Sequence, residues 1–169
     1  MSETVPSAFL VDAFSDPVLV RIQGRAAFQN SAGLKDFFST MIAKGARRFA
    51  VDFLSCASMD STFLGVLAGT ALQLRKLSPP GSLTLCRLSA RNLELVKNLG
   101  LHRLLTVDAA APANIDKAGQ VIENPKARDD VAGARLVLEA HENLVTADSS
   151  NQDRFQDVMD FLRNQIEPK

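Results

Sequence analysis

The sequence predicts an α/β fold in which helices pack on a mixed β-sheet. Short runs of strand-favouring residues alternate with segments whose apolar residues recur at helical spacing. Gly and Pro stand where several of these segments end, as they do at turns. Residues 47–54 form a compact apolar run after two charges, which is typical of a central strand covered by helices. A chain of 169 residues is long enough for one main domain and an appendage.

The first segments predict a hairpin followed by a helix. Residues 8–14 and 18–22 are strand-favouring runs separated by a Ser-Asp-Pro turn. Residues 31–44 carry apolar side chains at helical spacing, with Ser31 as a candidate cap and Gly45 near the end. The apolar positions of this helix are Leu34, Phe37, Phe38, Met41 and Ile42.

Strands and helices continue to alternate after the central strand. Residues 60–77 predict a second helix, which a Pro-Pro-Gly stretch ends, and residues 82–88 predict the next strand. Residues 89–99 predict a third helix, capped by its first serine and closed by Gly100 at the position that favours left-handed backbone. Residues 104–107 predict a short last strand. This alternation indicates a layered α/β structure with a mixed sheet.

The composition changes after residue 107, which predicts a domain boundary. Residues 108–128 are rich in Ala, Pro, Asn and charge, as linkers often are. We therefore expect a domain over residues 1–107, a linker over 108–128 and a helical extension over 129–169.

The extension predicts two helices joined as a hairpin. Helical spacing covers residues 129–146, weakened by Gly133, and residues 152–166, where Ser150 and Asp153 resemble a capping box. The stripe of the last helix is Phe155, Val158, Met159, Leu162 and Ile166. A hairpin of this size cannot bury its apolar faces alone, so it needs the main domain or a second copy in a homodimer.

Charge is divided unevenly along a chain whose net charge is zero. Residues 1–106 hold 12 Lys or Arg and 7 Asp or Glu, a net charge of +5, whereas residues 107–169 hold 7 and 12, a net charge of −5. Two interpretations stay open. Either a solvated surface happens to split this way, or the acidic tail docks on the basic domain or on a shared partner.

The composition argues against several classes of function. The chain has no Trp and no Tyr, and its basic pairs are short, so we expect no direct binding of nucleic acid. Cys56 and Cys86 lie in apolar runs without CxxC spacing or clustered His, which predicts core residues and neither a metal nor a cofactor. No apolar run approaches the roughly 18 residues of a membrane span and the N-terminus lacks a secretory pattern, so we expect a cytoplasmic protein.

Ser61 stands in the first turn of the second predicted helix, directly after a strand and a short loop. A phosphate there would add about −1.5 to −2 charge, which the unpaired amides at a helix N-terminus favour. The plainer interpretation is that Asp60 and Ser61 only cap the helix. The two roles are compatible with each other.

Four motifs occur in the order that one known family shows. They are Phe49-Ala50-Val51-Asp52-Phe53, Met59-Asp60-Ser61-Thr62-Phe63-Leu64-Gly65-Val66-Leu67, Gly81-Ser82-Leu83-Thr84-Leu85 and Asn98-Leu99-Gly100-Leu101-His102-Arg103-Leu104-Leu105. This stretch resembles the STAS family, the domain of bacterial anti-sigma factor antagonists that is also found on sulfate transporters. With the hairpin and first helix, the resemblance covers about residues 8–107, and the Asp-Ser-x-x-Leu-Gly element at residues 60–65 is its most specific part. It implies a STAS-like mixed sheet with helices packed on it, to which the C-terminal helical hairpin is added.

The resemblance implies a phosphorylation switch. In the phosphorylatable members that this chain resembles, the serine after the aspartate is modified by a partner kinase of the histidine-kinase-like ATPase type, and a protein phosphatase reverses the modification. Carried over, that serine is Ser61, with Thr62 as a secondary candidate. The family pattern implies that the unmodified protein binds the kinase, which is also an anti-sigma factor, and that phosphorylation breaks the complex.

The same resemblance suggests a partner-binding face around the start of the second helix. Phe63, Val66 and Thr70 lie on the flank away from the predicted core stripe, and Gly65 would allow close approach. Many family members have glycine at the place of Phe63, so two alternatives are open: Phe63 belongs to this face, or it folds back under the first strands. With Asp60, Ser61 and Thr62, these residues complete the expected partner-binding site.

Two other classes of function compete with this hypothesis. A serine nucleophile at Ser61 would need a general base, but there is no Gly-x-Ser-x-Gly elbow, and His102 and His141 lie in unrelated sequence contexts, so we expect no enzyme. The other alternative is a STAS-like module that binds a protein or ligand in a sensory or transport assembly without phosphorylation. It stays open because a family resemblance predicts the fold of a protein better than its function.

Overall fold

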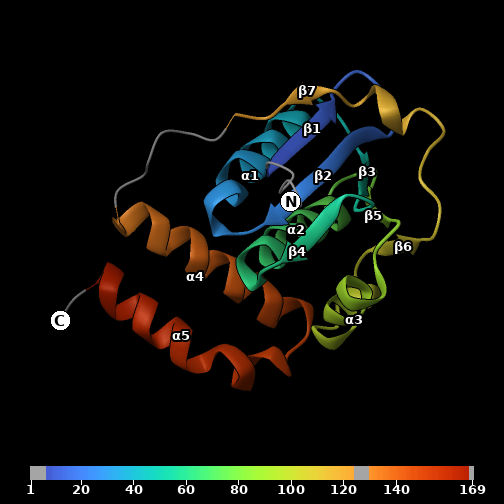
Figure 1. Ribbon diagram of the computed structural model, residues 1–169. Helices are drawn as coiled ribbons and strands as arrows, with labels where there is room; N and C mark the ends of the chain where they lie inside the picture. Colours follow the sequence, from blue (N-terminus) through green and yellow to red (C-terminus); the bar gives the residue numbers. More distant parts are fainter. Residues whose placement is uncertain (1–6, 124–129, 168–169) are drawn as a thin grey trace, which may run out of the picture.

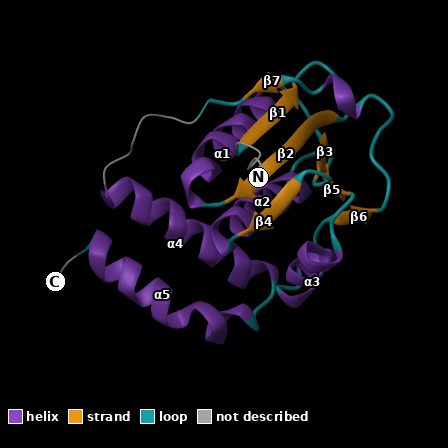
Figure 2. Ribbon diagram, in the orientation of Figure 1, coloured by secondary structure: helices purple, strands orange, loops and turns teal. Residues whose placement is uncertain are grey.

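The computed structural model describes residues 7–123 and 130–167 and shows a mixed sheet with helices packed on it (Figure 1). The strands are β1 Ala8–Asp12, β2 Val18–Ala26, β3 Arg48–Asp52, β4 Cys56–Met59, β5 Ser82–Cys86, β6 Thr106–Asp108 and β7 Gln120–Val121. The helices are α1 Phe28–Ala43, α2 Ser61–Arg75, α3 Ala90–Asn98, α4 Asp130–Ala147 and α5 Asn151–Ile166, with short 3-10 turns at η1 Leu101–Arg103 and η2 Ile115–Lys117. The α/β class expected from the sequence is confirmed (Figure 2).

The sheet has the order β6-β5-β3-β2-β1-β7, and β4 pairs with the end of β2. β1 and β2 form the expected antiparallel hairpin, β2, β3, β5 and β6 are parallel neighbours, and β7 lies antiparallel to β1. Sequence analysis did not predict β4, which pairs parallel with β2 beyond a register shift between Gly24 and Arg25. The short β4 leads directly into α2, so the start of α2 lies beside the end of β2.

The two faces of the sheet carry different layers, because alternate side chains along a strand point to opposite sides. Val20 and Val51 face the main core, which also takes in the buried side chains of α1 and α2. A smaller cluster on the other face consists of Leu19, Ala50, Cys86, Ile115 and Ala118. The segment between β6 and β7 therefore covers the far face of the sheet.

Part of the expected linker is structured. The turn η2 packs on the far face of the sheet, and β7 pairs with β1 through Leu10 opposite Val121 and Val11 opposite Gln120. Residues 124–128 of that linker lie outside the described residues, as does Asp129, the expected first residue of the extension. The division into domain, linker and extension stays a prediction.

Helix α1 begins three residues before the sequence prediction. Ser31 is not its cap: the Ser31 hydroxyl lies inside the first turns and donates to the carbonyl oxygen of Ala27 at 2.7 Å. Two other side chains cap this end of the helix. The side-chain oxygen of Asn30 accepts from the amide of Ala27, and a carboxylate oxygen of Asp60 accepts from the amide of Phe28. The second cap comes from a residue 32 positions away, which periodicity cannot indicate.

The extension forms the expected helical hairpin (Figure 1). Met159 and Leu162 of the α5 stripe are buried, whereas Val158 is 38% exposed. The expected capping box at Ser150 is wrong, because the Ser150 hydroxyl donates to Asp148 Oδ1 at 2.7 Å and gives α5 no side-chain cap. α4 packs along α2 of the same chain, so the main domain covers its apolar face. The homodimer stays a prediction.

An ion pair joins the ends of β3 and β5. Both nitrogens of the Arg87 fork donate to the carboxylate of Asp52 at 2.7 Å, and Asp52 is 3% exposed. The side-chain hydrogen bond to Asp52 raises the pKa of Arg87 above its ordinary value. The backbone of Arg87 is left-handed, with φ of 54°, which costs a residue with a Cβ about 1–2 kcal/mol.

We predict that Arg87→Ala lowers the free energy of unfolding by about 2–4 kcal/mol, because the buried carboxylate of Asp52 loses its partner. Arg87→Gly loses the same ion pair but relieves the left-handed backbone, so it should be about 1 kcal/mol more stable than Arg87→Ala. Urea unfolding of both variants measures the difference. A glycine variant no more stable than the alanine variant would contradict the role given to the backbone.

Candidate functional site

The carboxylate of Asp60 holds the N-termini of two helices. Its Oδ1 accepts from the amide of Phe63 in α2 at 2.9 Å, and its Oδ2 accepts from the amide of Phe28 in α1 at 2.8 Å. The amide of Asp60 donates to the carbonyl oxygen of Ala26 at the end of β2. A negative charge between two helix N-termini is favourable, because both macrodipoles present their positive ends to it. Asp60 therefore fixes the position of Ser61, the first residue of α2.

Ser61 is half-buried and forms a hydrogen bond with a histidine of the C-terminal hairpin. Its Oγ lies 2.8 Å from Nε2 of His141 in α4. The Nδ1 of His141 lies 2.7 Å from the carbonyl oxygen of Val137, which can only accept, so Nδ1 carries a proton. In the neutral imidazole Nε2 is then an acceptor, and Ser61 donates to it. His141 is 4% exposed and meets the ring of Phe155 edge to face, with ring centroids 4.8 Å apart.

The two residues after Ser61 point into the protein. Phe63 is fully buried between Phe9 and Phe53, with ring centroids 5.8 and 6.2 Å away. Of the two alternatives for this residue, the structure has the one in which it folds under the first strands. Thr62, the secondary candidate for phosphorylation, is 5% exposed. Ser61 is therefore more exposed than either of the two residues that follow it.

The remaining expected partner-binding residues lie under other helices. Val66 and Thr70 are 4% and 6% exposed, and the hydroxyl of Thr70 donates to the carbonyl oxygen of Val66. Gly65 lies against α4, where an added Cβ would be 2.5 Å from the carbonyl carbon of Ala140. Gly65, Val66 and Thr70, which we call the α2 docking face, are thus covered by α1 and α4.

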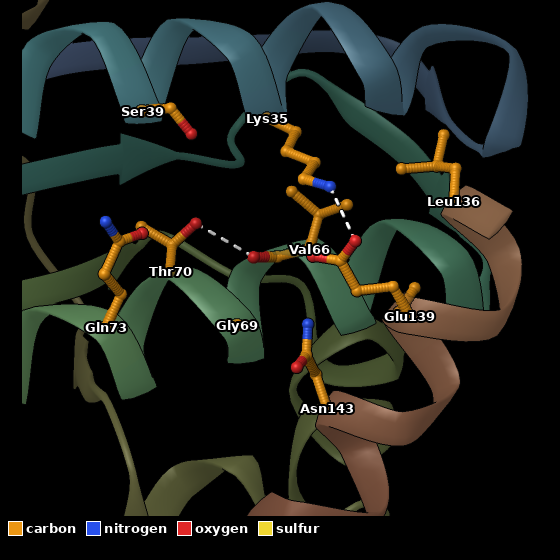
Figure 3. A pocket seen from close by; sticks show the side chains of 10 residues that line it. Lys35, Ser39, Val66, Gly69, Thr70, Gln73, Leu136, Glu139 and Asn143 are labelled. Atoms are coloured by element: carbon orange, nitrogen blue, oxygen red, sulfur yellow. Dashed lines mark hydrogen bonds and ion pairs between the residues drawn. The ribbon is translucent and has the colours of Figure 1, made fainter. Parts of the chain in front are cut away.

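A small cavity remains where α1, α2 and α4 meet. Its volume is about 110 Å³, and its lining is largely polar (Figure 3). The lining residues are Lys35, Ser39, Val66, Gly69, Thr70, Gln73, Leu136, Glu139, Ala140 and Asn143. Figure 3 shows Lys35 of α1 and Glu139 of α4 reaching toward each other across its rim, where they form an ion pair of 2.8 Å. Ser61 does not line this cavity.

His141 is the site residue that sequence reasoning missed. It lies 80 residues from Ser61, so no local spacing relates the two. One signal was present in the sequence: His141 falls among the positions of the first extension helix that are apolar and buried, Ala134, Leu136, Ala140 and Leu144. A polar side chain on that stripe has to find a partner within the protein.

The uneven charge of the chain corresponds to contacts in the structure. Glu139 of α4 pairs with Lys35 of α1, and Asp148 pairs with Arg103 at 3.6 Å. The acidic extension therefore docks on the basic main domain. In each pair at least one side chain is largely exposed, so the two pairs contribute little stability.

The two cysteines are core residues, as expected. Burial raises the pKa of the Cys56 thiol to about 11, and burial together with the charges of Asp108 and Asp52 raises that of Cys86 to about 11. Both thiols are thus protonated and unreactive at neutral pH. Within residues 7–123 and 130–167, no three His, Cys, Asp or Glu side chains gather as a metal site. None of the helices in these ranges is long and apolar enough to span a bilayer.

Comparison with known proteins identifies the class. Residues 9–113 match the family described as "Mlab, STAS domain", and this match covers more than half of the chain. The chain therefore belongs to the STAS domain family, which confirms the resemblance found in its motifs. α4 and α5 lie outside the matched residues. No curated protein matches the chain significantly.

Three solved structures share this fold. The anti-sigma factor antagonist SpoIIAA in its unphosphorylated form has a TM-score of 0.53 and 19% identity, over 65% of this chain and 96% of that one. The Bacillus cell fate determinant SpoIIAA in its phosphorylated form has a TM-score of 0.52 and 22% identity, over 65% and 98%. A candidate anti-sigma factor antagonist from Thermotoga maritima, tm1081, has a TM-score of 0.53 and 16% identity, over 65% and 93%. At these identities the likeness shows the fold alone.

We predict that Gly65→Ala lowers the free energy of unfolding by about 1–3 kcal/mol, because the added methyl group overlaps the backbone of Ala140. The loss should occur although alanine favours a helix over glycine by about 1 kcal/mol. Gly119→Ala is the matched control, since its added Cβ meets nothing closer than 3.9 Å and should change stability by less than about 0.5 kcal/mol. Thermal or urea unfolding compares them, and a stabilised Gly65→Ala would contradict the close approach of α4.

A double-mutant cycle tests the bond between Ser61 and His141. Ser61→Ala and His141→Phe should each destabilise the protein, and the coupling energy between them should be about 0.5–1.5 kcal/mol, the net value of a hydrogen bond. Urea unfolding of the two single variants and the double variant supplies the four stabilities. A coupling energy near zero would mean that the two side chains do not interact in solution.

Proposed function

We propose that this chain is an anti-sigma factor antagonist-like regulatory protein that binds a partner kinase and is switched by reversible phosphorylation of Ser61. One observation carries the proposal: in a STAS domain, the hydroxyl of Ser61 stands at the first turn of α2, directly after the capping Asp60. SpoIIAA, whose fold this domain shares, has been solved in unphosphorylated and phosphorylated forms. The partner would be a serine kinase and anti-sigma factor of the histidine-kinase-like ATPase type, and a protein phosphatase would reverse its action in the cytoplasm.

The local electrostatics give a phosphate at Ser61 a defined effect. The amides of the first turn of α2 and the macrodipole favour the added negative charge. The carboxylate of Asp60 lies at the same helix end and opposes it, so a phosphate would compete with Asp60 for the amide of Phe63. Phosphorylation would thereby alter the start of α2, where the partner is expected to bind. A coupling of about 1–3 kcal/mol would weaken partner binding about 5- to 150-fold.

Ser61, His141 and the carbonyl oxygen of Val137 supply three elements of a nucleophilic site, but we assign them no catalysis. A serine, a histidine base and a carbonyl that orients the histidine follow the logic of a catalytic triad. A substrate carbonyl would have to reach Ser61 Oγ on the side that the imidazole leaves open. Here the ring is 4% exposed and Phe155 packs against it, and the nearby cavity does not include Ser61. The pair therefore fits a closed contact better than a reaction site.

The second candidate is a STAS module that binds a protein or ligand in a sensory or transport assembly and is never phosphorylated. The hydrogen bond between Ser61 and α4 favours it, because a hydroxyl bonded to His141 already has a structural role. This alternative predicts a stable partner whose affinity is the same for the wild-type chain and for Ser61→Asp.

We predict that a cognate kinase with ATP adds one phosphate to the chain, and that Ser61→Ala abolishes the addition. The kinases to test are any serine kinases of the histidine-kinase-like ATPase type that neighbouring genes encode. Thr62→Val is the matched control and should still accept the phosphate, because Thr62 is buried and is not the acceptor. Intact-mass and peptide mass spectrometry locate the site. Failure of every such kinase, or phosphate that persists in Ser61→Ala, would count against the proposal.

A further inference from the structure

The C-terminal hairpin of α4 and α5 covers the part of α2 that the proposed function gives to the partner. Gly65, Val66 and Thr70 are buried, and α4 packs along α2. His141 of the same helix occupies the hydrogen bond of Ser61. In this conformation the α2 docking face is covered, and the half-buried hydroxyl of Ser61 is already bonded to His141.

Two glycines let α4 approach α2 at backbone distance. An added Cβ at Gly65 would lie 2.5 Å from the carbonyl carbon of Ala140, and one at Gly69 would lie 3.1 Å from Cγ of Asn143. Only the missing side chains of α2 make room for a helix this close. The groove on α2 would accept a helix of another protein in the same way if a small residue faced Gly65. This fit indicates the chemistry of the partner element: an α-helix with a small residue at the crossing point.

The contact between α2 and α4 is partly polar and incompletely filled. Asn143 Nδ2 lies 3.5 Å from the carbonyl oxygen of Gly65, and the 110 Å³ cavity remains beside it (Figure 3). The ion pair of Lys35 and Glu139 at the rim is exposed and contributes little. Leu136 and Leu144 of α4 belong to the main core, so the contact is also apolar in part. Local opening would begin at its polar side, around Lys35, Glu139 and Asn143.

A phosphate on Ser61 would remove the hydroxyl hydrogen that now bonds to His141 and would crowd a docked α4. Transfer of the γ-phosphoryl group of ATP breaks the bond between the γ-phosphorus and the bridging oxygen, which leaves with ADP. It forms a bond between phosphorus and Ser61 Oγ, and the hydroxyl proton is released. The three added oxygens would need the space in which the imidazole of His141 now lies, 2.8 Å from Oγ. The imidazole cannot move aside within the closed contact, because it is buried against Phe155.

We propose that the C-terminal hairpin is a displaceable competitor of the partner kinase for the α2 docking face, held closed in part by the hydrogen bond between Ser61 and His141. This inference rests on the proposed function, whose site it regulates. With the hairpin closed, the acceptor hydroxyl and the docking face are shielded together. When it lifts, both become available to a helix of the kinase. A phosphate on Ser61 then prevents the hairpin from closing again.

A reversible disulfide can hold the hairpin closed in the full chain. Gly69→Cys combined with Asn143→Cys places one thiol on α2 and one on α4. The Sγ of the cysteine at position 143 would take the place of Cγ of Asn143, which lies 3.1 Å from a Cβ added at position 69, so the two sulfurs can reach each other. Cys56 and Cys86 are buried with a raised pKa and do not compete for the bond. The reduced form of the same double variant is the control, since it differs only in the cross-link.

We expect the oxidised variant to accept phosphate from its kinase at least about tenfold more slowly than the reduced variant, and reduction to restore the rate. Ala140→Leu, which pushes α4 from α2 but leaves the docking face unchanged, should be phosphorylated faster than wild type, whereas Thr146→Leu on the exposed side of α4 should not. Equal rates for the oxidised and reduced forms would overturn the proposal.

Hydrogen exchange tests the hairpin without any kinase. In the wild-type chain, we expect the amides of α4 to exchange at least about tenfold faster than those of β3, and the oxidised disulfide to remove this difference. Equal protection of α4 and β3 in the wild type would overturn the proposal, because the hairpin would then open only on global unfolding. Fast exchange of α4 with no phosphate on Ser61 in any variant would support the displaceable hairpin and overturn the proposed function.

Discussion

The carboxylate of Asp60 is the interaction on which the rest of the site depends. It accepts hydrogen bonds from the first turns of α1 and α2, and its own amide bonds to the end of β2. One short side chain therefore ties two helices and one strand together at a single point. Because each helix leaves amides unpaired at its N-terminus, this point carries positive potential from two directions. This local potential stabilises the negative charge of Asp60.

The same geometry would let Ser61 combine its structural role with the regulatory role that we propose for it. As the first residue of α2, it needs no side-chain bond of its own for the helix to form, since Asp60 supplies the cap. Its hydroxyl is free to bond outside the helix, and here it bonds to His141. The local fold thus tolerates a change at Ser61, while the contact with α4 does not. A modification would act on the arrangement of the hairpin more than on the stability of the sheet.

Local patterns in the sequence predicted most of the main domain. The hairpin, the central strand, α2 and the Ser89 cap of α3 follow from apolar periodicity and turn residues, whose effects reach only a few positions along the chain. β4 was missed because four residues are too few for a periodic signal. The early start of α1 was missed because a distant side chain, that of Asp60, caps it.

The candidate site divides in the same way. The position of Ser61 in the first turn of α2 could be predicted from its neighbours, but its partner could not, because 80 residues separate it from His141. The inward orientation of Phe63 depends on contacts with Phe9 and Phe53, which lie elsewhere in the sequence. The sequence alone therefore left open whether Phe63 faces a partner or packs inside the protein. The position of α4 over Gly65 depends on tertiary packing, which the sequence does not indicate. The glycine itself only indicated that another backbone could approach closely there.

The two native cysteines have a use that follows from where they lie. Cys56 belongs to the main core and Cys86 to the cluster on the far face of the sheet, and burial keeps both thiols protonated. Neither lies between α2 and α4, so lifting of the C-terminal helices alone should not expose them to a thiol reagent. They therefore report opening of the main core or of the cluster on the far face. Against that internal reference, any motion confined to the C-terminal helices can be recognised as local without introducing a label.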